Sequence, residues 1–216
     1  MRQPYIDEQK RQRVILASIE EFAKGYEVAS TNEIVRKAGI SKGLLFHYFG
    51  NKKSLYMSVF TEVVQQTAEA LFSRVGELPG DVIERMIRLA LTKLELYRED
   101  PKAWLFLADA VSNPPDELRQ EIRSVQAELT HAGMETFLAS LDFAGLRSDV
   151  KPAQLLKFVQ LLLKGLEQEY LGRGDLALLD WEEVMNEFMV YTELLRTGIG
   201  CRCEPDRDPR MGCGLA

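Results

Sequence analysis

The stretch SKGLLFHYFGNKK at residues 41–53 combines cations, hydroxyl groups and a glycine in a way that suits contact with a polyanion. From residue 34 to residue 61 the chain has no Asp or Glu, although it contains 33 of them in total. An acidic side chain facing a phosphate backbone would weaken binding by repulsion, so an acid-free basic surface favours nucleic-acid contact. A chance fluctuation of composition would leave the same gap. The cations of this stretch are Arg36, Lys37, Lys42, Lys52 and Lys53.

Charge is distributed unevenly between the two ends of the chain. Residues 1–55 hold ten Lys and Arg against six Asp and Glu, whereas residues 56–216 hold seventeen against twenty-seven. The formal net charge is −6, but local charge rather than net charge steers a polyanion. The sequence therefore predicts a basic head with a polyanionic partner and an acidic body.

The head has the signals of short helices joined by tight turns. Apolar residues at 15, 19, 22 and 26 predict a helix over about residues 7–24, which Gly25 ends. Ser30 and Glu33 form a capping-box pattern, in which the Ser30 hydroxyl accepts from the N–H at 33 and the Glu33 carboxylate returns to the N–H of Ser30. This second helix ends at Gly39. Ser41 then caps a third helix, and Asn51 caps a fourth that runs to about residue 74.

Two short helices joined by a glycine turn are typical of a helix-turn-helix motif, whose second helix reads the major groove. Two residues of the third helix, at 45 and 49, point to the core, and the others are left for contact. Among these, Lys42 offers a cation, Gly43 allows close approach to the bases and Leu44 can touch a thymine methyl group. His47 and Tyr48 offer donors to phosphate oxygens, and a neutral surface histidine is the other interpretation of His47.

The segment GYEVASTNEIVRKAGISKGLLFHYFGNKKSLYMSVF at residues 25–60 resembles the N-terminal DNA-binding domain of the TetR family of bacterial transcriptional repressors. The resemblance implies an all-helical homodimer that binds a palindromic operator in double-stranded DNA and releases it when a small molecule binds. Phe46 departs from the family pattern, which usually has tyrosine there, so its ring packs either on sugar or on protein. The DNA contacts that the resemblance implies are Ser30, Thr31, Lys42, Gly43, Leu44, Phe46, His47, Tyr48 and Lys52.

Helical periodicity continues to the C-terminal region. Five further helices are expected over residues 82–97, from Pro101, from Pro114–Pro115, over 152–171 and from Trp181. In the helix that follows Pro115, the apolar face changes side at Gly133. Three explanations are open: the helix bends there, its second half is covered by neighbours on both sides, or a cavity lies beneath it. The predicted fold is therefore all-α, with about nine helices. The predicted domains are a three-helix helix-turn-helix domain at 1–53, a ligand-binding and dimerisation domain at 54–197, and a disordered tail at 198–216.

The last two predicted helices are too apolar on two faces to be covered by one neighbour, so a symmetric four-helix interface between two subunits is expected. Closure of the core within one chain is the alternative. The predicted interface residues are Leu155, Val159, Leu162, Leu166, Tyr170, Val184, Phe188, Tyr191 and Leu195.

A small-molecule pocket is expected from the resemblance, and its candidate lining is mostly apolar with three polar anchors. Each of these residues is also compatible with ordinary core packing. The ligand is expected to be lipophilic and its identity is open. The lining residues are Val63, Leu91, Tyr97, Trp104, Leu107, His131, Met134, Phe137, Leu166 and Glu167.

Other functions have weaker support in the sequence. Cys201, Cys203 and Cys213 offer three thiolates but lack the paired loops of a zinc site, so no metal or cofactor is expected. No catalytic constellation is recognisable, so an enzyme is not expected. A helical scaffold protein whose basic head binds an acidic protein partner is the main rival. No run of eighteen apolar residues and no secretion signal occur, which predicts a cytoplasmic protein without membrane contact.

Overall fold

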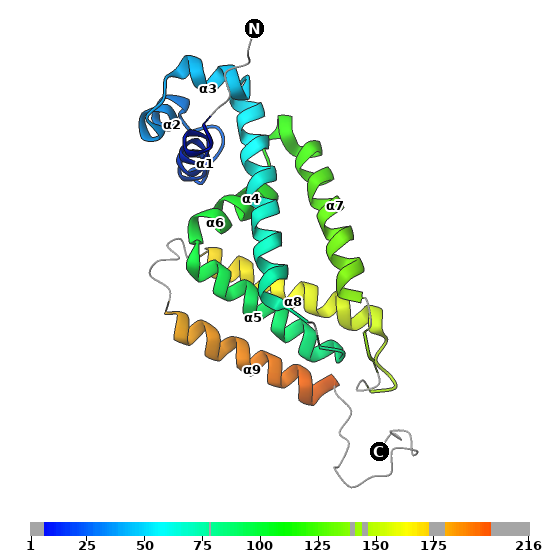
Figure 1. The fold of residues 1–216 in the computed structure, drawn as a ribbon. Coiled ribbons are helices and arrows are strands. Elements are labelled where there is room, and N and C mark those ends of the chain that lie inside the picture. The colour runs from blue at the N-terminus through cyan, green and yellow to red at the C-terminus, as the bar shows by residue number, and fades with distance from the viewer. Residues whose placement is uncertain (1–6, 78, 139–140, 144–146, 173–179, 200–216) are drawn as a thin grey trace. The chain divides into compact units, whose positions relative to one another are not determined.

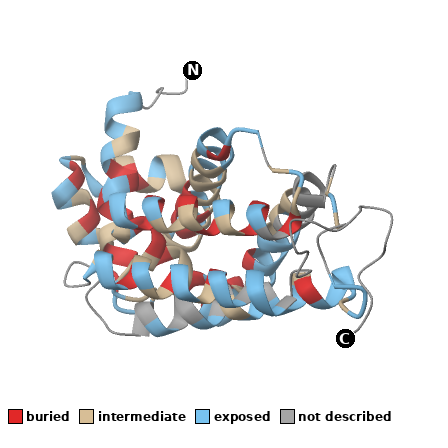
Figure 2. Cartoon of the chain, turned by 90° about the horizontal axis from the view of Figure 1, so that it is seen from below, coloured by how far each residue is buried: buried red, intermediate tan, exposed pale blue. Residues whose placement is uncertain are grey.

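The chain folds into α-helices in the computed structural model (Figure 1). The described ranges contain nine α-helices, one 3₁₀ helix and no strand, apart from an isolated bridge between Asp81 and Asp142. The predicted all-α fold with about nine helices is confirmed. Helices of the chain carry buried residues on parts of their surface and exposed residues on others (Figure 2), as amphipathic helices do. The structure describes residues 7–77, 79–138, 141–143, 147–172 and 180–199.

Two compact units make up the fold. Unit 1 comprises residues 1–70 and 99–135, and unit 2 comprises residues 71–98 and 136–216. The sequence predicted a domain boundary after residue 53. In the structure, residues 54–70 and 99–135 lie in the same compact unit as the N-terminal helices and share one apolar core with them.

Three short helices begin unit 1, and their ends follow local capping rules. They are α1 (Glu8–Phe22), α2 (Thr31–Ala38) and α3 (Lys42–Phe49). Gly39 ends α2 with a φ of 67°, a left-handed conformation that glycine adopts without steric cost. The Ser41 side chain accepts a hydrogen bond from the N–H of Leu44 at 3.2 Å, which caps α3 as predicted.

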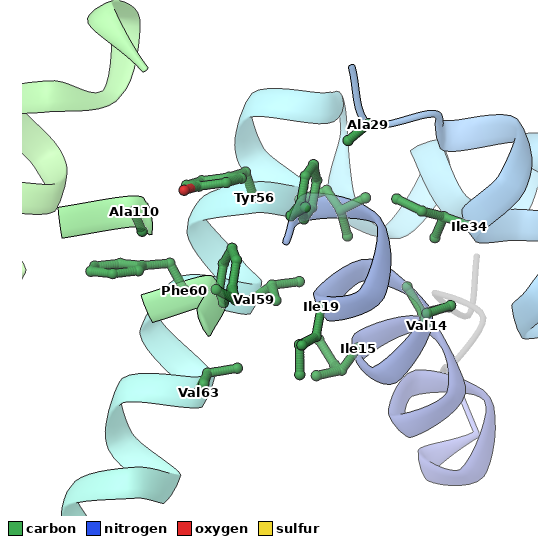
Figure 3. Close-up of a cluster of buried hydrophobic side chains, with 14 of the residues drawn as sticks. Val14, Ile15, Ile19, Ala29, Ile34, Tyr56, Val59, Phe60, Val63 and Ala110 are labelled. Atoms are coloured by element: carbon green, nitrogen blue, oxygen red, sulfur yellow. The ribbon is translucent and has the colours of Figure 1, made fainter. Parts of the chain in front are cut away.

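The remaining helices of unit 1 complete the core around these three. They are α4 (Lys52–Val75), which continues into unit 2, α6 (Pro101–Ser112), the 3₁₀ helix η1 (Asp116–Leu118) and α7 (Arg119–Leu138), which also crosses into unit 2. Figure 3 shows side chains of α4 pointing into the space shared with α1 and α6. The core of unit 1 includes Ile15, Phe22, Ile34, Leu45, Tyr56, Val59, Phe60, Phe106, Leu118 and Ile122.

An aromatic cluster lies at the centre of this core. The Tyr56 ring meets the rings of Phe22, Tyr26 and Phe106 edge-on, with centroids 4.8, 5.2 and 5.3 Å away. Edge-to-face pairs of this kind stabilise by about 0.5–1.5 kcal/mol beyond area burial. The Tyr26 hydroxyl donates to the Glu117 carboxylate at 2.6 Å. Burial and this carboxylate both raise the pKa of Tyr26, so the hydroxyl remains a donor at neutral pH.

A chain of ion pairs connects α6, α1 and α2 at the edge of the core. Lys102 of α6 contacts Glu20 of α1 at 2.5 Å, and Glu20 contacts Lys37 of α2 at 3.0 Å. Lys37 also reaches Glu21 at 3.1 Å, and Lys24 pairs with the same carboxylate. Networks of this kind fix relative helix positions more effectively than isolated surface pairs.

Unit 2 is built from α5 (Val82–Glu99), α8 (Pro152–Gly172) and α9 (Trp181–Ile199), with the ends of α4 and α7. A small cluster joins α5 to α8 through Val82, Met86 and Leu155. Among the described side chains of α9, those buried by the chain itself are Val184, Phe188 and Thr192.

Replacing Ser18 with alanine is expected to stabilise the fold. The Ser18 side chain is fully buried in α1, and its hydroxyl makes no hydrogen bond in the described part of the chain. An unsatisfied buried hydroxyl costs about 1–3 kcal/mol. Ser18→Ala should therefore raise the free energy of unfolding, measured by urea denaturation, by about 1 kcal/mol more than Ser58→Ala does. Ser58 is an exposed helical serine on α4, so it gains the same helix propensity without the buried hydroxyl. Equal effects of the two changes would contradict this account of Ser18.

Replacing Glu20 with glutamine is expected to lower the melting temperature at neutral pH but not in acid. Hydrogen bonds from Lys102 and Lys37 hold the pKa of Glu20 at about 2, below its ordinary 4.5. A depressed carboxyl pKa gives stability that is present above about pH 4.5 and is lost as the pH falls towards 2. Since Glu20 is partly exposed, the effect should be a few degrees at most.

Melting curves of the wild type and Glu20→Gln between about pH 3 and pH 7 test this pH dependence. Glu27→Gln, at an exposed position in the α1–α2 connection, serves as the control and should change little. A difference between wild type and Glu20→Gln that stayed constant down to pH 3 would show that the ion pairs are not its cause.

Candidate nucleic-acid interface

Helix α3 is anchored on one side and open on the other. Leu45 is completely buried in the core of unit 1, and Phe49 packs against that core. A Cβ atom added at Gly43 would meet nothing within 4 Å, so the surface there is open. The predicted contact residues of α3 are all exposed or half-buried, namely Lys42, Gly43, Leu44, Phe46, His47 and Tyr48.

The cation at the start of α3 is held in place by two neighbours. The Lys42 ammonium group donates to Oδ1 of Asn32 on α2 at 3.0 Å and lies 5.9 Å from the centre of the Phe46 ring. Phe46 is half-buried and packs beneath this cation. On the same helix, the His47 and Tyr48 rings meet edge-on at 5.4 Å. Lys42 is therefore positioned by both helices of the motif, and Phe46 packs on protein at least in part.

The beginning of α2 differs in one respect from the predicted capping box. The Ser30 hydroxyl accepts from the N–H of Glu33 at 3.5 Å, as predicted. The Glu33 carboxylate, however, receives hydrogen bonds from Arg36 at 2.7 and 2.9 Å, one turn further along. The arginine one turn away therefore competes with the Ser30 N–H for the Glu33 carboxylate.

The beginning of α4 carries the predicted asparagine cap. The Asn51 side chain accepts from the N–H of Ser54 at 2.8 Å. The Lys52 ammonium group donates to the Glu27 carbonyl at 3.3 Å and lies 4.8 Å above the Tyr26 ring. Lys52 is therefore attached to the α1–α2 connection, with the positive end of the α4 dipole beside it.

Lys53 lies differently from its neighbour. Its ammonium group donates to the Glu117 carbonyl at 2.9 Å and pairs with Glu121 at 3.2 Å. Its position in the sequence places Lys53 among the basic residues of the head, but in the structure it connects α4 to η1 and α7.

Two residues that contact cations of the head, Asn32 and Glu21, were not predicted from the sequence. Asn32, which holds Lys42, lies on the second helix and had no signal of its own. Glu21 did have one, because positions 14, 17, 18 and 21 of α1 form a second stripe with helical spacing, and the structure buries all four. A carboxylate at the end of a buried stripe indicates a specific partner.

Among the described side chains of α8 and α9, the exposed apolar ones differ from those predicted for the interface. Leu155, Val184 and Phe188 are buried within their own chain, because they form the inner stripes of these helices. Leu162 and Tyr191 are half-buried, and the side chains of Val159, Leu166, Tyr170 and Leu195 lie outside the described residues. The exposed apolar side chains beside them are Phe158, Leu161, Met189, Val190 and Leu194, which are 51–61% exposed.

A shallow apolar groove of about 480 Å³ lies between α8 and α9 within unit 2. Its walls include Leu155, Phe158 and Leu162 of α8, and Tyr191 and Leu194 of α9. Two of these residues, Phe158 and Leu194, also belong to the exposed apolar set.

The candidate lining of the small-molecule pocket is divided between the two units. Val63 and Trp104 are buried in unit 1, where Val63 and the partly buried Leu107 pack with the aromatic core. Leu91 is half-buried and Tyr97 is buried on α5 of unit 2. The side chains of His131, Met134, Phe137, Leu166 and Glu167 lie outside the described residues.

Two further expectations concern the ends of the chain and membranes. Residues 198 and 199 complete α9, whereas the rest of the predicted tail, with its three cysteines, lies outside the described residues.

Among the described helices, none has the length and hydrophobicity needed to span a bilayer.

Comparisons with known proteins agree with this geometry. The model of the bacterial regulatory proteins of the tetR family matches residues 14–59, which cover most of α1 and continue into α4. The HTH-type transcriptional regulator BetI of Escherichia coli O127:H6 (strain E2348/69 / EPEC) is 28% identical over 111 residues, which are 49% of this chain and 57% of that protein. The chain thus matches little more than half the length of these relatives.

Solved structures share the fold over most of the chain. A TetR-like transcriptional regulator from Rhodococcus sp. RHA1 matches with a TM-score of 0.64 and 19% identity, over 88% of this chain and 96% of that one. The regulator FadR from Bacillus subtilis, in complex with stearoyl-CoA, matches with a TM-score of 0.62 and 18% identity, over 88% of this chain and 99% of that one.

The capped helices α2 and α3, with the open surface of α3, lie within the residues that the family model matches. Through residues 14–59, the chain is similar to the TetR family of bacterial regulatory proteins.

Proposed function

We propose that this protein is a sequence-specific DNA-binding transcriptional regulator, a repressor that a small lipophilic ligand releases from a palindromic operator. The observation that carries the proposal is the surface of α3. It is anchored by Leu45, it has no acidic residue, and it presents Lys42, Gly43 and His47 to solvent.

On this proposal, α3 enters the major groove. The open surface at Gly43 allows close approach, and Leu44 contacts base edges beside it. Lys42, His47 and Tyr48 bind phosphates, as do Ser30 and Thr31 at the start of α2 and Lys52 at the start of α4. The contacts of Lys42 with Asn32 and Phe46 support a phosphate role, because they reduce the entropy that the side chain loses on binding.

A palindromic operator requires two copies of the head about 34–36 Å apart. The exposed apolar side chains of α8 and α9 support a homodimer, since five large apolar residues at 51–61% exposure need a cover. The groove between these helices would accept side chains of the second copy in a self-complementary interface.

Release by a ligand follows from population shift. A ligand that binds better to a form with differently spaced heads lowers the fraction able to contact both half-sites. A lipophilic ligand is supported by the stearoyl-CoA held by the structurally similar FadR from Bacillus subtilis. Displacement of a bound operator by acyl-CoAs and fatty acids of graded length is the assay that identifies the ligand class.

The rival function, a scaffold that binds an acidic protein through its basic head, is not favoured. The relatives that share the head are transcriptional regulators by name. The open surface at Gly43 and Leu44 also suits base edges, which an acidic protein partner would not need.

Lys42→Ala and Tyr48→Phe should both weaken operator binding. Lys42→Ala removes a cation near a phosphate, so the operator affinity should fall about tenfold and the salt dependence by about one unit of log–log slope. Tyr48→Phe removes one hydroxyl donor and should cost about three- to tenfold. The affinities are measured by fluorescence anisotropy at several salt concentrations, on a fragment selected from genomic DNA.

Lys151→Ala is the matched control for these variants, because Lys151 is an exposed lysine of unit 2. Its operator affinity should equal that of the wild type. If Lys42→Ala and Lys151→Ala bound the fragment equally well, the assignment of α3 to DNA would be wrong.

Leu194→Glu should convert the protein to a monomer. It places a charge in the proposed interface, where desolvation of an unpaired carboxylate opposes association. Sedimentation velocity at micromolar concentration measures the change. Leu16→Glu is the control, because Leu16 on α1 is 60% exposed and Leu194 is 61% exposed. A Leu194→Glu protein that sedimented as the wild type does would place the subunit contact elsewhere.

A further inference from the structure

The ammonium group of Lys52, which is proposed above to bind a phosphate, is held by two neutral partners. It donates to the Glu27 carbonyl at 3.3 Å and lies over the Tyr26 ring, 4.8 Å from its centre. Within the part of the chain that the structure describes, Lys52 makes no ion pair with a carboxylate. Its neighbour Lys53, by contrast, pairs with Glu121 at 3.2 Å.

This kind of contact leaves the charge of the lysine available for DNA. A carboxylate partner would neutralise the ammonium group and compete with a phosphate for it. A carbonyl oxygen or the negative face of an aromatic ring also attracts a cation, but neither carries a net charge. Lys52 therefore keeps its full positive charge in a fixed place, which reduces the entropy that its long side chain loses on binding.

Other lysines of unit 1 show that the type of partner follows the proposed role. Lys42, which is also assigned to a phosphate, has a neutral acceptor on Asn32 at 3.0 Å and the Phe46 ring at 5.9 Å. The lysines that connect the helices of the unit have carboxylate partners instead, as the ion pairs of Lys37, Lys53 and Lys102 show. Neutral partners thus coincide with the residues proposed to contact DNA.

The Tyr26 ring that holds Lys52 is itself fixed by three contacts. Its hydroxyl donates to the Glu117 carboxylate at 2.6 Å. The ring meets the Tyr56 ring edge-on at 5.2 Å and stacks on the Phe22 ring at 6.2 Å. A hydroxyl that donates to a carboxylate also shifts electron density towards its ring, which strengthens the attraction for a cation. The place of the ring is therefore determined jointly by α1, α4 and η1.

We propose that Tyr26 is a positioning residue for operator binding: its ring holds the Lys52 ammonium group at the start of α4, with its charge uncancelled, where it meets a phosphate. The inference rests on the DNA-binding function proposed above. It assigns to Tyr26 a contribution to operator affinity that acts through Lys52 and through no other DNA contact.

A double-mutant cycle on operator affinity tests this role. Lys52→Met removes the cation and should weaken operator binding about tenfold. Tyr26→Leu removes the ring and should weaken binding about fivefold, because an unheld Lys52 loses more entropy when it binds. In the Lys52→Met background Tyr26→Leu should have no further effect, whereas a merely structural role of Tyr26 would lower the affinity in both backgrounds.

Two matched controls separate the ring from its surroundings. Tyr26→Phe keeps the ring and its position in the core, so its operator affinity should stay within about twofold of the wild type. In the Lys42→Ala background, Tyr26→Leu should still cost about fivefold, because Lys42 is held by Asn32 and Phe46 instead.

NMR of the free protein examines the contact in the absence of DNA. Protons above an aromatic ring are shielded, so the ε-methylene signal of Lys52 should lie upfield in the wild type and in Tyr26→Phe. In Tyr26→Leu it should return to the ordinary position of a lysine. An unshifted signal in the wild type would reject the contact, whatever the affinities are.

Other outcomes also overturn the inference. Equal losses from Tyr26→Leu with and without Lys52 would reject the positioning role, and so would an unchanged operator affinity of Lys52→Met. A loss in Tyr26→Phe as large as that in Tyr26→Leu would assign the effect to the hydroxyl and not to the ring.

If Tyr26→Leu does not fold, pentafluorophenylalanine in place of Tyr26 decides, because fluorine removes the negative face of a ring of similar size. A loss of about threefold in operator affinity relative to Tyr26→Phe supports the role, and equal affinities reject it. A wild type that prefers no DNA fragment would instead reject the proposed function.

Discussion

The structure of unit 1 depends on one apolar core that the helix-turn-helix motif does not complete by itself. Short helices of eight residues, such as α2 and α3, cannot bury enough surface to be stable alone. Their buried residues belong to the same core as Phe22 of α1, Tyr56 and Phe60 of α4, and Phe106 of α6. The same core that buries Leu45 forces the opposite side of α3 towards solvent, and in this way core packing creates the exposed surface.

Polar contacts fix the relative positions of the helices that surround this apolar core. Hydrophobic burial is non-directional, whereas hydrogen bonds and ion pairs specify distances between particular atoms. Lys102, Glu20 and Lys37 connect α6 to α2 across α1, and the Tyr26 hydroxyl connects the end of α1 to Glu117. Lys53 forms a further connection, from α4 to η1 and α7. The head is thus joined to α6 and α7 by contacts with defined geometry, which a change in these helices would alter.

The charge pattern has a consistent physical explanation. Acidic residues of unit 1 such as Glu20, Glu21 and Glu117 are engaged with cations or hydroxyl groups of neighbouring helices. The stretch without acids contains all of α3 and the start of α4, where a carboxylate would repel phosphates. One chain therefore combines an acidic composition with a basic contact surface.

Much of the local structure could be predicted from the sequence, because caps and helical periodicity depend on residues close together in the chain. Ser30, Gly39, Ser41 and Asn51 act at helix ends as expected, and the all-α fold followed from apolar spacing. The open face of α3 followed from the same spacing, because Leu45 and Phe49 define its buried side.

Only the tertiary structure decided which long-range partner each polar or apolar group takes. Glu33 pairs with Arg36 instead of closing the capping box, and Lys53 binds the start of α7 rather than remaining with the basic residues beside it. On α8 and α9 the apolar stripes were recognisable, but which stripe faces the chain's own core could not be derived from periodicity. Periodicity gives the direction of a side chain around its helix axis, whereas burial depends on where other helices lie.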